Sequence, residues 1–172
     1  AFTGDGRGQH FTGALAVCRG LGHPLAHGHQ ALGIVHLAAL LPPTSERFGE
    51  LAHRVNVAGT TRLVEAARIE KMRGPFVLAS SCTVYGPAAA DGRLAKVTDP
   101  TVGTDNYTRS KVEAEAIVRA AAPSPTIMRV GVAIEGARSA ADPIVMRQLF
   151  EVAPDNPIEL VHGEDVALAI AN

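Results

Sequence analysis

The sequence has few aromatic residues, few cysteines and no excess charge of either sign. Tryptophan is absent, aromatic residues make up 4% of the 172 residues, and the formal net charge is −1. A chain without a basic excess has little with which to neutralise a phosphate backbone, so we expect no nucleic-acid partner. Cys18 and Cys82 belong to no CxxC or Cys/His pattern. We therefore expect neither a disulfide framework nor a bound metal, and a cytoplasmic location fits.

Long apolar runs are missing as well. The stretch Gly33–Leu41 is interrupted by His36 and ended by Pro42 and Pro43, and it is far shorter than the about 20 residues of a membrane span. The first residues show neither the basic start nor the apolar run of a secretory signal. We expect no membrane partner. With 47% hydrophobic and 19% charged residues, the chain can bury a core and is not a disordered tail.

The chain does contain an alternation of strand-like and helix-like segments. Short apolar runs typical of buried parallel strands occur at Gly33–Leu37, Pro75–Ala79 and Thr126–Val130. Apolar residues recur at helical spacing through Glu46–Lys71 and Asp105–Ala122. This alternation predicts right-handed βαβ units and an α/β domain with a parallel sheet.

The N-terminal part departs from this alternation. Ala1–Thr3 are expected to end a strand that leads into a glycine-rich loop, Gly4–Gly13, whose backbone could approach a pyrophosphate. Ala14–Leu21 are expected to form a helix. The interval from that helix to the strand at Gly33 is shorter than the dozen or more residues that a parallel crossover needs. A complete βαβ unit is therefore not expected there.

Tyr107 and Lys111 are the most informative pair of side chains. They lie four residues apart on an expected helix and so share one face. An ammonium beside a phenol favours the phenolate and lowers its pKa, which makes the pair a general acid/base. The alternative is an exposed Tyr and Lys on a solvated helix face. The charged residues of the same helix, Glu113, Glu115 and Arg119, are expected on such a face.

Hydroxyl side chains follow the expected strand at Pro75–Ala79. Ser80, Ser81 and Thr83 come at its carboxyl end, which is where ligands bind in a parallel sheet. We expect them to hydrogen-bond a substrate oxygen. The alternative is local capping of the junction between strand and loop.

Taken in order, the motifs resemble the short-chain dehydrogenase/reductase superfamily, in its extended, nucleotide-sugar epimerase/dehydratase branch. The resemblance covers most of residues 33–172. It implies a Rossmann-like doubly wound parallel sheet with helices on both faces, divided into an NAD(P)-binding domain at 1–130 and the start of a substrate-binding lobe at 131–172. The matching motifs are Val35-His-Leu-Ala-Ala39, Asn56-Val-Ala-Gly-Thr60, Leu63-Val-Glu-Ala-Ala67, Ser80-Ser-Cys-Thr-Val-Tyr-Gly86, Tyr107-Thr-Arg-Ser-Lys111, Met128-Arg-Val-Gly131 and Val161-His-Gly-Glu-Asp-Val-Ala167.

The resemblance also implies roles for individual residues. Tyr107 would be the catalytic acid/base, Lys111 would hold the nicotinamide ribose and tune Tyr107, and Ser81 would be the third catalytic residue. The substrate would contact Ser81, Cys82, Thr83 and Tyr107. The cofactor, NAD with NADP not excluded, would contact the glycine loop, the strand ends and the helices at Gly4, Gly8, Gly13, Leu37, Ala38, Ala39, Asn56, Ala79, Ser80, Tyr107, Lys111 and Val130.

The implied activity is epimerisation or dehydration of a nucleotide-activated sugar by hydride transfer, in a homodimer formed through the helices around 46–70 and 105–122. Dehydratases of this branch usually carry an acidic pair where this chain has Cys82 and Thr83, which favours an epimerase. An NAD(P)H-dependent ketone or aldehyde reductase with the same catalytic residues is the first alternative. A non-catalytic nucleotide-binding remnant is the second. No large apolar stripe favours an interaction scaffold.

Several features depart from the family pattern. Little of a first strand precedes Thr3, and the loop keeps Gly4 and Gly8 of TGxxxGxG but has His10 in place of the last glycine. The second and third strands, with the residue that selects NAD or NADP, are missing between Gly22 and Gly33. A sheet that lacks internal strands would leave buried edges unpaired. We therefore expect the 172 residues to be part of a longer polypeptide.

Overall fold

The computed structural model describes residues 15–18, 31–87, 93–134 and 159–171. The chain divides into two units, Ala1–Arg129 and Val130–Asn172, each described by itself. The first unit is built on a four-stranded sheet in the order β1-β2-β3-β4. The strands are β1 Leu15–Cys18, β2 Ala31–His36, β3 Phe76–Ser81 and β4 Pro125–Val130.

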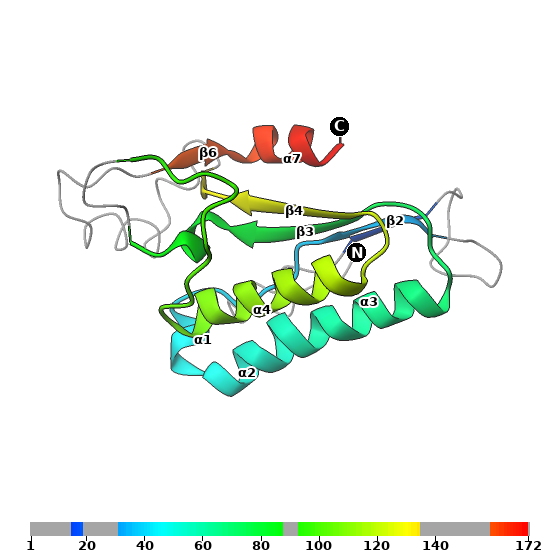
Figure 1. Ribbon diagram of the computed structural model, residues 1–172, viewed down its shortest axis with the longest axis horizontal. Coiled ribbons are helices and arrows are strands. Elements are labelled where there is room, and N and C mark those ends of the chain that lie inside the picture. Colours follow the sequence, from blue (N-terminus) through cyan, green and yellow to red (C-terminus); the bar gives the residue numbers. More distant parts are fainter. Residues whose placement is uncertain (1–14, 19–30, 88–92, 135–158, 172) are drawn as a thin grey trace, which may run out of the picture. The chain divides into compact units, whose positions relative to one another are not determined.

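The parallel part of the sheet lies where the apolar runs predict it. Strands β2 and β3 pair in parallel, with Ile34 opposite Phe76 and His36 opposite Leu78. The arrow of β4 points the same way as that of β3 (Figure 1). Both β2 and β3 therefore end on the same side of the sheet, at His36 and Ser81.

The first strand corrects the helix expected at Ala14–Leu21, because Leu15–Cys18 form β1 and pair antiparallel with β2. An antiparallel neighbour needs no long crossover, so this pairing suits the short connection to Ala31. A short apolar run such as Leu-Ala-Val-Cys has no period that separates a strand from a buried helix. The expected strand at Ala1–Thr3 and the glycine-rich loop lie outside the described residues.

The long helix expected at Glu46–Lys71 is divided. Its described parts are α1 Thr44–Arg47, α2 Gly49–His53, the π-helical turn η1 Arg54–Ala58 and α3 Gly59–Ile69. The division between α1 and α2 falls at Phe48, whose φ of −130° and ψ of 64° are not helical. The apolar spacing continues across this break, so periodicity alone could not reveal it.

Helix α4 runs from Asn106 to Ala121, close to the predicted bounds. Asp105 begins it with a capping box, in which the Asp105 carboxylate accepts from the Thr108 amide and the Thr108 hydroxyl accepts from the Asp105 amide. This arrangement satisfies amides that the first turn of a helix otherwise leaves unpaired. The first turn of α4, which carries Tyr107, is therefore fixed by local sequence.

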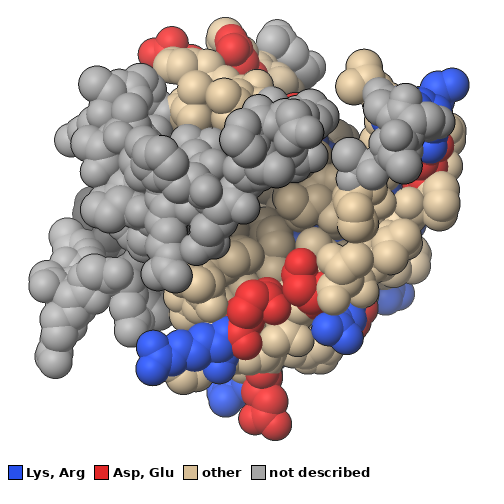
Figure 2. Space-filling view, turned by 90° about the vertical axis from the view of Figure 1, so that its left-hand side faces the viewer, with Lys and Arg blue, Asp and Glu red and all other residues tan. Residues whose placement is uncertain are grey.

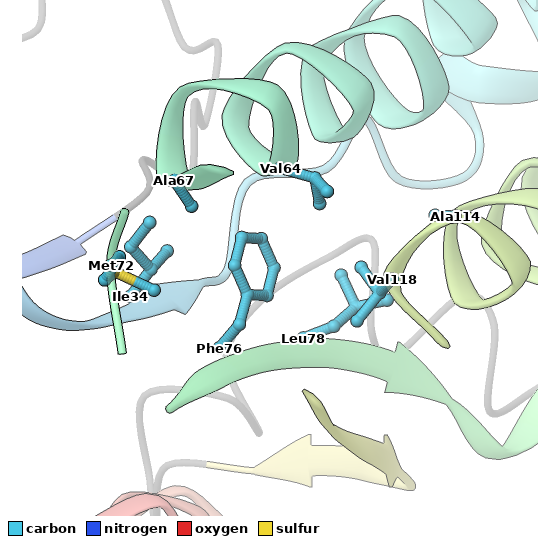
Figure 3. Packing of buried hydrophobic residues seen from close by; sticks show 8 residues of the cluster. All are labelled: Ile34, Val64, Ala67, Met72, Phe76, Leu78, Ala114 and Val118. Carbon is cyan, nitrogen blue, oxygen red and sulfur yellow. The ribbon is translucent and has the colours of Figure 1, made fainter. Parts of the chain in front are cut away.

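Helices α3 and α4 lie side by side on one face of the sheet (Figure 1). Between them and the strands, Phe76 points toward Val64, and Leu78 lies against Val118 (Figure 3). Full burial of one such large side chain contributes about 1.5–3 kcal/mol. The core that fixes α4 on β3 consists of Ile34, Val64, Ala67, Met72, Phe76, Leu78, Ala114 and Val118.

After β3 the chain makes a short 3-10 turn, η2 Cys82–Tyr85, and Gly86 then takes a φ of 78° that favours glycine. In the second unit, β5 Val132–Ile134 pairs in parallel with β6 Leu160–His162, and α7 Gly163–Ala171 follows. Among helices of the described residues, none combines the length and apolar character that a bilayer crossing requires.

Candidate active site

Lys111 is buried beneath the end of β3. Its side chain is 4% exposed, and its Nζ donates a 2.7 Å hydrogen bond to the carbonyl of Ala79. The same Nζ lies 5.7 Å from the centre of the Tyr107 ring. The structure thus brings Tyr107 and Lys111 together on the face of α4 that turns toward the sheet, and this burial excludes the solvated-face alternative for Lys111.

Ser81 is the last residue of β3 and the N-cap of η2. Its Oγ accepts two hydrogen bonds from Thr83, 2.8 Å from the hydroxyl and 3.3 Å from the amide. Because its lone pairs serve Thr83, the Ser81 hydroxyl can direct its own proton to another acceptor, and it hydrogen-bonds the side chain of Tyr107. Ser81 can therefore both cap the junction between strand and loop and serve as a side chain of the candidate site.

Burial raises the pKa of the Tyr107 hydroxyl to about 12, although the hydrogen bond from Ser81 acts in the opposite direction. The sequence predicts a lowered pKa from the neighbouring ammonium, and in this structure the direction is reversed. The reason is desolvation, which disfavours the phenolate. Burial also lowers the pKa of Lys111 to about 8, while the Glu115 carboxylate raises it. Lys111 therefore carries its charge at neutral pH.

Asn56 joins the end of β2 to α4. It lies in η1, is buried, and exchanges hydrogen bonds with the backbone of Leu40 through Oδ1 at 2.7 Å and Nδ2 at 3.1 Å. Its Nδ2 also donates to the Ser110 Oγ at 2.9 Å, and Ser110 donates to the carbonyl of Tyr107 at 2.7 Å. Asn56 thus supports the turn of α4 on which Tyr107 lies.

Glu46 is a supporting residue that the sequence reasoning missed. Its carboxylate accepts from the amides of Asn106 and Tyr107, each at 3.0 Å. A carboxylate at a helix N-terminus accepts hydrogen bonds from otherwise unpaired amides and interacts favourably with the positive end of the helix dipole. No local signal could have found it, because Glu46 is distant in sequence from the helix that it caps.

Glu115 corrects a prediction. The solvated face expected for the charges of this helix holds for Glu113 and Arg119, but Glu115 is 0% exposed. Its Oε1 accepts from the Ser80 hydroxyl at 2.5 Å. Burial raises the pKa of Glu115, and hydrogen bonds from Arg129, Ser80 and Arg119 outweigh this and hold it below its usual range. The missed signal is the i,i+4 spacing from Lys111, which places both side chains on one face.

His36 ends β2 and is 3% exposed. Thr60 donates its one hydroxyl proton to the Asn56 carbonyl at 2.6 Å, so at 2.8 Å it must accept from His36 Nε2. His36 is therefore the Nε2–H tautomer. Its Nδ1 is a buried acceptor with no hydrogen-bond partner among the described residues. Burial, and then the charge of Lys111, lower the pKa of His36 to about 4.

The remaining expected site residues fall into three groups. Leu37, Ala38 and Ala39 follow β2 and are at least half-buried. Ser80 turns toward Glu115, Cys82 is half-buried, Thr83 is exposed, and Val130 ends β4. Gly4, Gly8 and Gly13 lie outside the described residues. Within the described ranges, no group of three or more His, Cys, Asp or Glu side chains is arranged to hold a metal ion.

The end of the molecule at which β3 and β4 finish faces the viewer in Figure 2. Charged side chains gather on its lower part, at the height of α1 and α2 in Figure 1, with Lys and Arg next to Asp and Glu. Charges of mixed sign create no strong single-sign field. The coloured part of this face therefore shows no charged patch of a single sign.

Ser81, Tyr107 and Lys111 thus come together near the carboxyl ends of the parallel strands, as the resemblance to the short-chain dehydrogenase/reductase superfamily predicts. The chain belongs to the NAD dependent epimerase/dehydratase family, whose family model matches residues 23–149. Comparison with curated proteins gives no match.

Solved structures confirm the Rossmann-like fold. RMD from Pseudomonas aeruginosa complexed with NADPH is 20% identical with a TM-score of 0.69, and the match covers 83% of this chain and 56% of that one. DesIV, a dTDP-glucose 4,6-dehydratase from Streptomyces venezuelae with NAD and TYD bound, is 23% identical with a TM-score of 0.68 and coverage of 81% and 47%. A UDP-N-acetylglucosamine 4-epimerase from Methanobrevibacter ruminantium M1 is 16% identical with a TM-score of 0.66 and coverage of 81% and 50%. This chain spans about half the length of these solved chains.

Proposed function

We propose that this protein is an NAD(P)-dependent epimerase or dehydratase that acts on a nucleotide-activated sugar. The observation that carries the proposal is the buried Lys111 ammonium, which lies 5.7 Å from the centre of the Tyr107 ring at the end of the strand that Ser81 terminates. The family supports it, as do structures of similar fold with NAD and TYD or with UDP-N-acetylmuramic acid bound.

The described residues fit a nicotinamide dinucleotide. Lys111 has three N–H donors, of which one is assigned to the Ala79 carbonyl, so the others suit the vicinal hydroxyls of a ribose. Lys111 lies at the carboxyl end of β3, and ligands bind beyond the carboxyl ends of strands in such sheets. We assign binding of the ribose to Lys111 and Tyr107. We assign to Leu37–Ala39 and Asn56 the support of the cofactor-binding surface at this end of the sheet.

The bound dinucleotide would supply the acceptor and donor of hydride. Tyr107, whose raised pKa keeps it protonated at neutral pH, must first lose its own Oη proton to solvent. As the phenolate it would then take the proton of a sugar hydroxyl and later return it. Ser81 hydrogen-bonds the same Oη and so lowers the free energy of the phenolate. The ammonium of Lys111 contributes in the same direction through its charge. We further assign cofactor binding to residues 1–130 and substrate binding chiefly to residues 131–172.

Replacement of the Tyr107 hydroxyl tests this proposal. Tyr107→Phe keeps the ring beside Lys111 and removes the proton carrier, so we expect kcat to fall by about 10²–10⁴-fold. Dinucleotide binding, measured by fluorescence titration of the purified protein, should stay within about threefold, since Lys111 still holds the ribose. Full turnover in Tyr107→Phe would refute the catalytic assignment of Tyr107. No turnover in the wild-type protein itself would favour the non-catalytic remnant.

The second candidate is a ketone or aldehyde reductase. The raised pKa of Tyr107, about 12, keeps its proton in place at neutral pH, which favours proton donation to a carbonyl oxygen. Cofactor turnover separates the two activities. A reductase consumes one NAD(P)H for each product, whereas an epimerase recycles its own NAD and shows no net absorbance change at 340 nm.

A further inference from the structure

Arg129 forms a two-pronged ion pair with the buried carboxylate of Glu115. The guanidinium Nε donates to Oε1 at 3.0 Å and Nη2 donates to Oε2 at 2.8 Å. Such a paired geometry is specific to arginine and is stronger than a single contact. Glu115 lies one helical turn after Lys111 on α4, so Arg129 is anchored next to the candidate site from the side of β4.

The same guanidinium also contacts the segment of the chain that follows Ser81. We call residues 82–87 and 93–102 the site loop. The Arg129 guanidinium lies 4.6 Å from the centre of the Tyr85 ring, a cation–π contact. Its Nη1 donates to the carbonyl of Val97 at 3.3 Å. The two parts of the loop also meet directly, since the Val102 amide donates to the Val84 carbonyl at 2.6 Å.

We propose that Arg129 is a positioning residue for substrate binding, which holds the site loop against α4 through Tyr85 and Val97. The loop begins at Cys82 and Thr83, next to the Ser81 hydroxyl that contacts Tyr107. Because Arg129 anchors the loop to Glu115, it keeps Cys82 and Thr83 at a fixed position relative to the face of α4 that carries Tyr107. The substrate part of this inference rests on the proposed function.

Arg119 provides a matched control. Its Nη2 donates to the same Oε2 of Glu115 at 2.7 Å, but it comes from the same helix and its side chain is 51% exposed, against 11% for Arg129. Both arginines neutralise Glu115, and of the two it is Arg129 that also contacts Tyr85 and Val97 of the site loop. Comparison of the two therefore separates the loop contact from simple charge neutralisation.

The test compares Arg129→Lys, Tyr85→Leu and Arg119→Lys. Arg129→Lys keeps a positive charge beside Glu115 but cannot form the two paired hydrogen bonds with its carboxylate. Tyr85→Leu removes the ring contact and leaves the ion pair between Arg129 and Glu115 intact. Native-state trypsin cleavage of the Lys96–Val97 bond, without substrate or cofactor, reports release of the loop. Cleavage after the exposed Lys71, in the turn that follows α3, serves as the internal reference. Steady-state kinetics supply KM and kcat separately.

We expect Arg129→Lys and Tyr85→Leu to raise cleavage after Lys96 and KM for the nucleotide sugar by roughly tenfold, with kcat within about twofold. Arg119→Lys should match the wild-type protein in both. Equal cleavage in Arg129→Lys and Arg119→Lys, or a parallel rise after Lys71, would overturn the proposal, because the effect would then be absent or global. If the wild-type protein turned over no nucleotide sugar, the proposed function would fail, while the cleavage rates would still decide whether Arg129 holds the loop.

Discussion

His36 connects the stability of the fold to pH through one buried ring. Its pKa is about 4 in the folded protein and 6.5 in the unfolded chain, because burial disfavours the imidazolium. Below pH 6.5 the unfolded chain binds this proton first, so stability falls as the pH drops toward 4. Since each pKa unit corresponds to about 1.4 kcal/mol, the loss in the free energy of unfolding approaches about 3 kcal/mol.

His36→Gln tests this connection, since glutamine cannot titrate. We expect urea unfolding at pH 7.5 and pH 4.5 to show a smaller loss of unfolding free energy in His36→Gln than in the wild-type protein, by about 2–3 kcal/mol. His53→Gln is the control, because His53 is 58% exposed. The same pH dependence in all three proteins would show that His36 is not the titrating group.

Local spacing could predict which residues of the site come together, but not their electrostatics. Tyr107 and Lys111 lie one helical turn apart, and Ser81 follows a recognisable apolar strand, so sequence was sufficient to find them. The pKa of Tyr107 depends on how much protein covers it, which only the tertiary structure reveals. Glu115 and Arg129 meet across separate elements, and neither residue type nor local pattern indicated that contact.

At the scale of elements, the N-terminus of α4 depends on a carboxylate from another element. We expect Glu46→Ala to lower the free energy of unfolding by about 1 kcal/mol, because it leaves the amides of Asn106 and Tyr107 without their acceptor. Glu50→Ala, an exposed carboxylate on α2, is the matched control. Chemical denaturation that gives equal midpoints for the two variants would exclude the capping role of Glu46.

Elements were predictable where the sequence carries its own boundary signals. The bounds of α4 follow from Asp105 and Pro123, and β3 from its apolar run. Strand β1 was mistaken for a helix because its state depends on pairing with β2, a tertiary contact. The break at Phe48 leaves the apolar spacing unchanged and was equally invisible. The homodimer through the helices around 46–70 and 105–122 stays a prediction.

At the scale of the whole molecule, the candidate site depends on several elements that must fold together. His36 ends β2, Ser81 ends β3, and Tyr107 and Lys111 come from α4. A ligand that binds only this assembled arrangement stabilises it against unfolding. The gain is about 2.7 kcal/mol when the ligand is present at about 100 times its dissociation constant.

Thermal unfolding with added dinucleotide therefore tests the cofactor assignment. A gain of that size should raise Tm by roughly 5–11 °C for a domain of this size. The larger of the NAD and NADP shifts would identify the preferred cofactor, which the sequence leaves open. Lys111→Met should reduce the shift, since it removes the ammonium assigned to the ribose. If neither dinucleotide moved Tm at millimolar concentration, while the protein still unfolded cooperatively, these residues would not form a dinucleotide site. Retention of the full shift in Lys111→Met would instead place the cofactor away from α4.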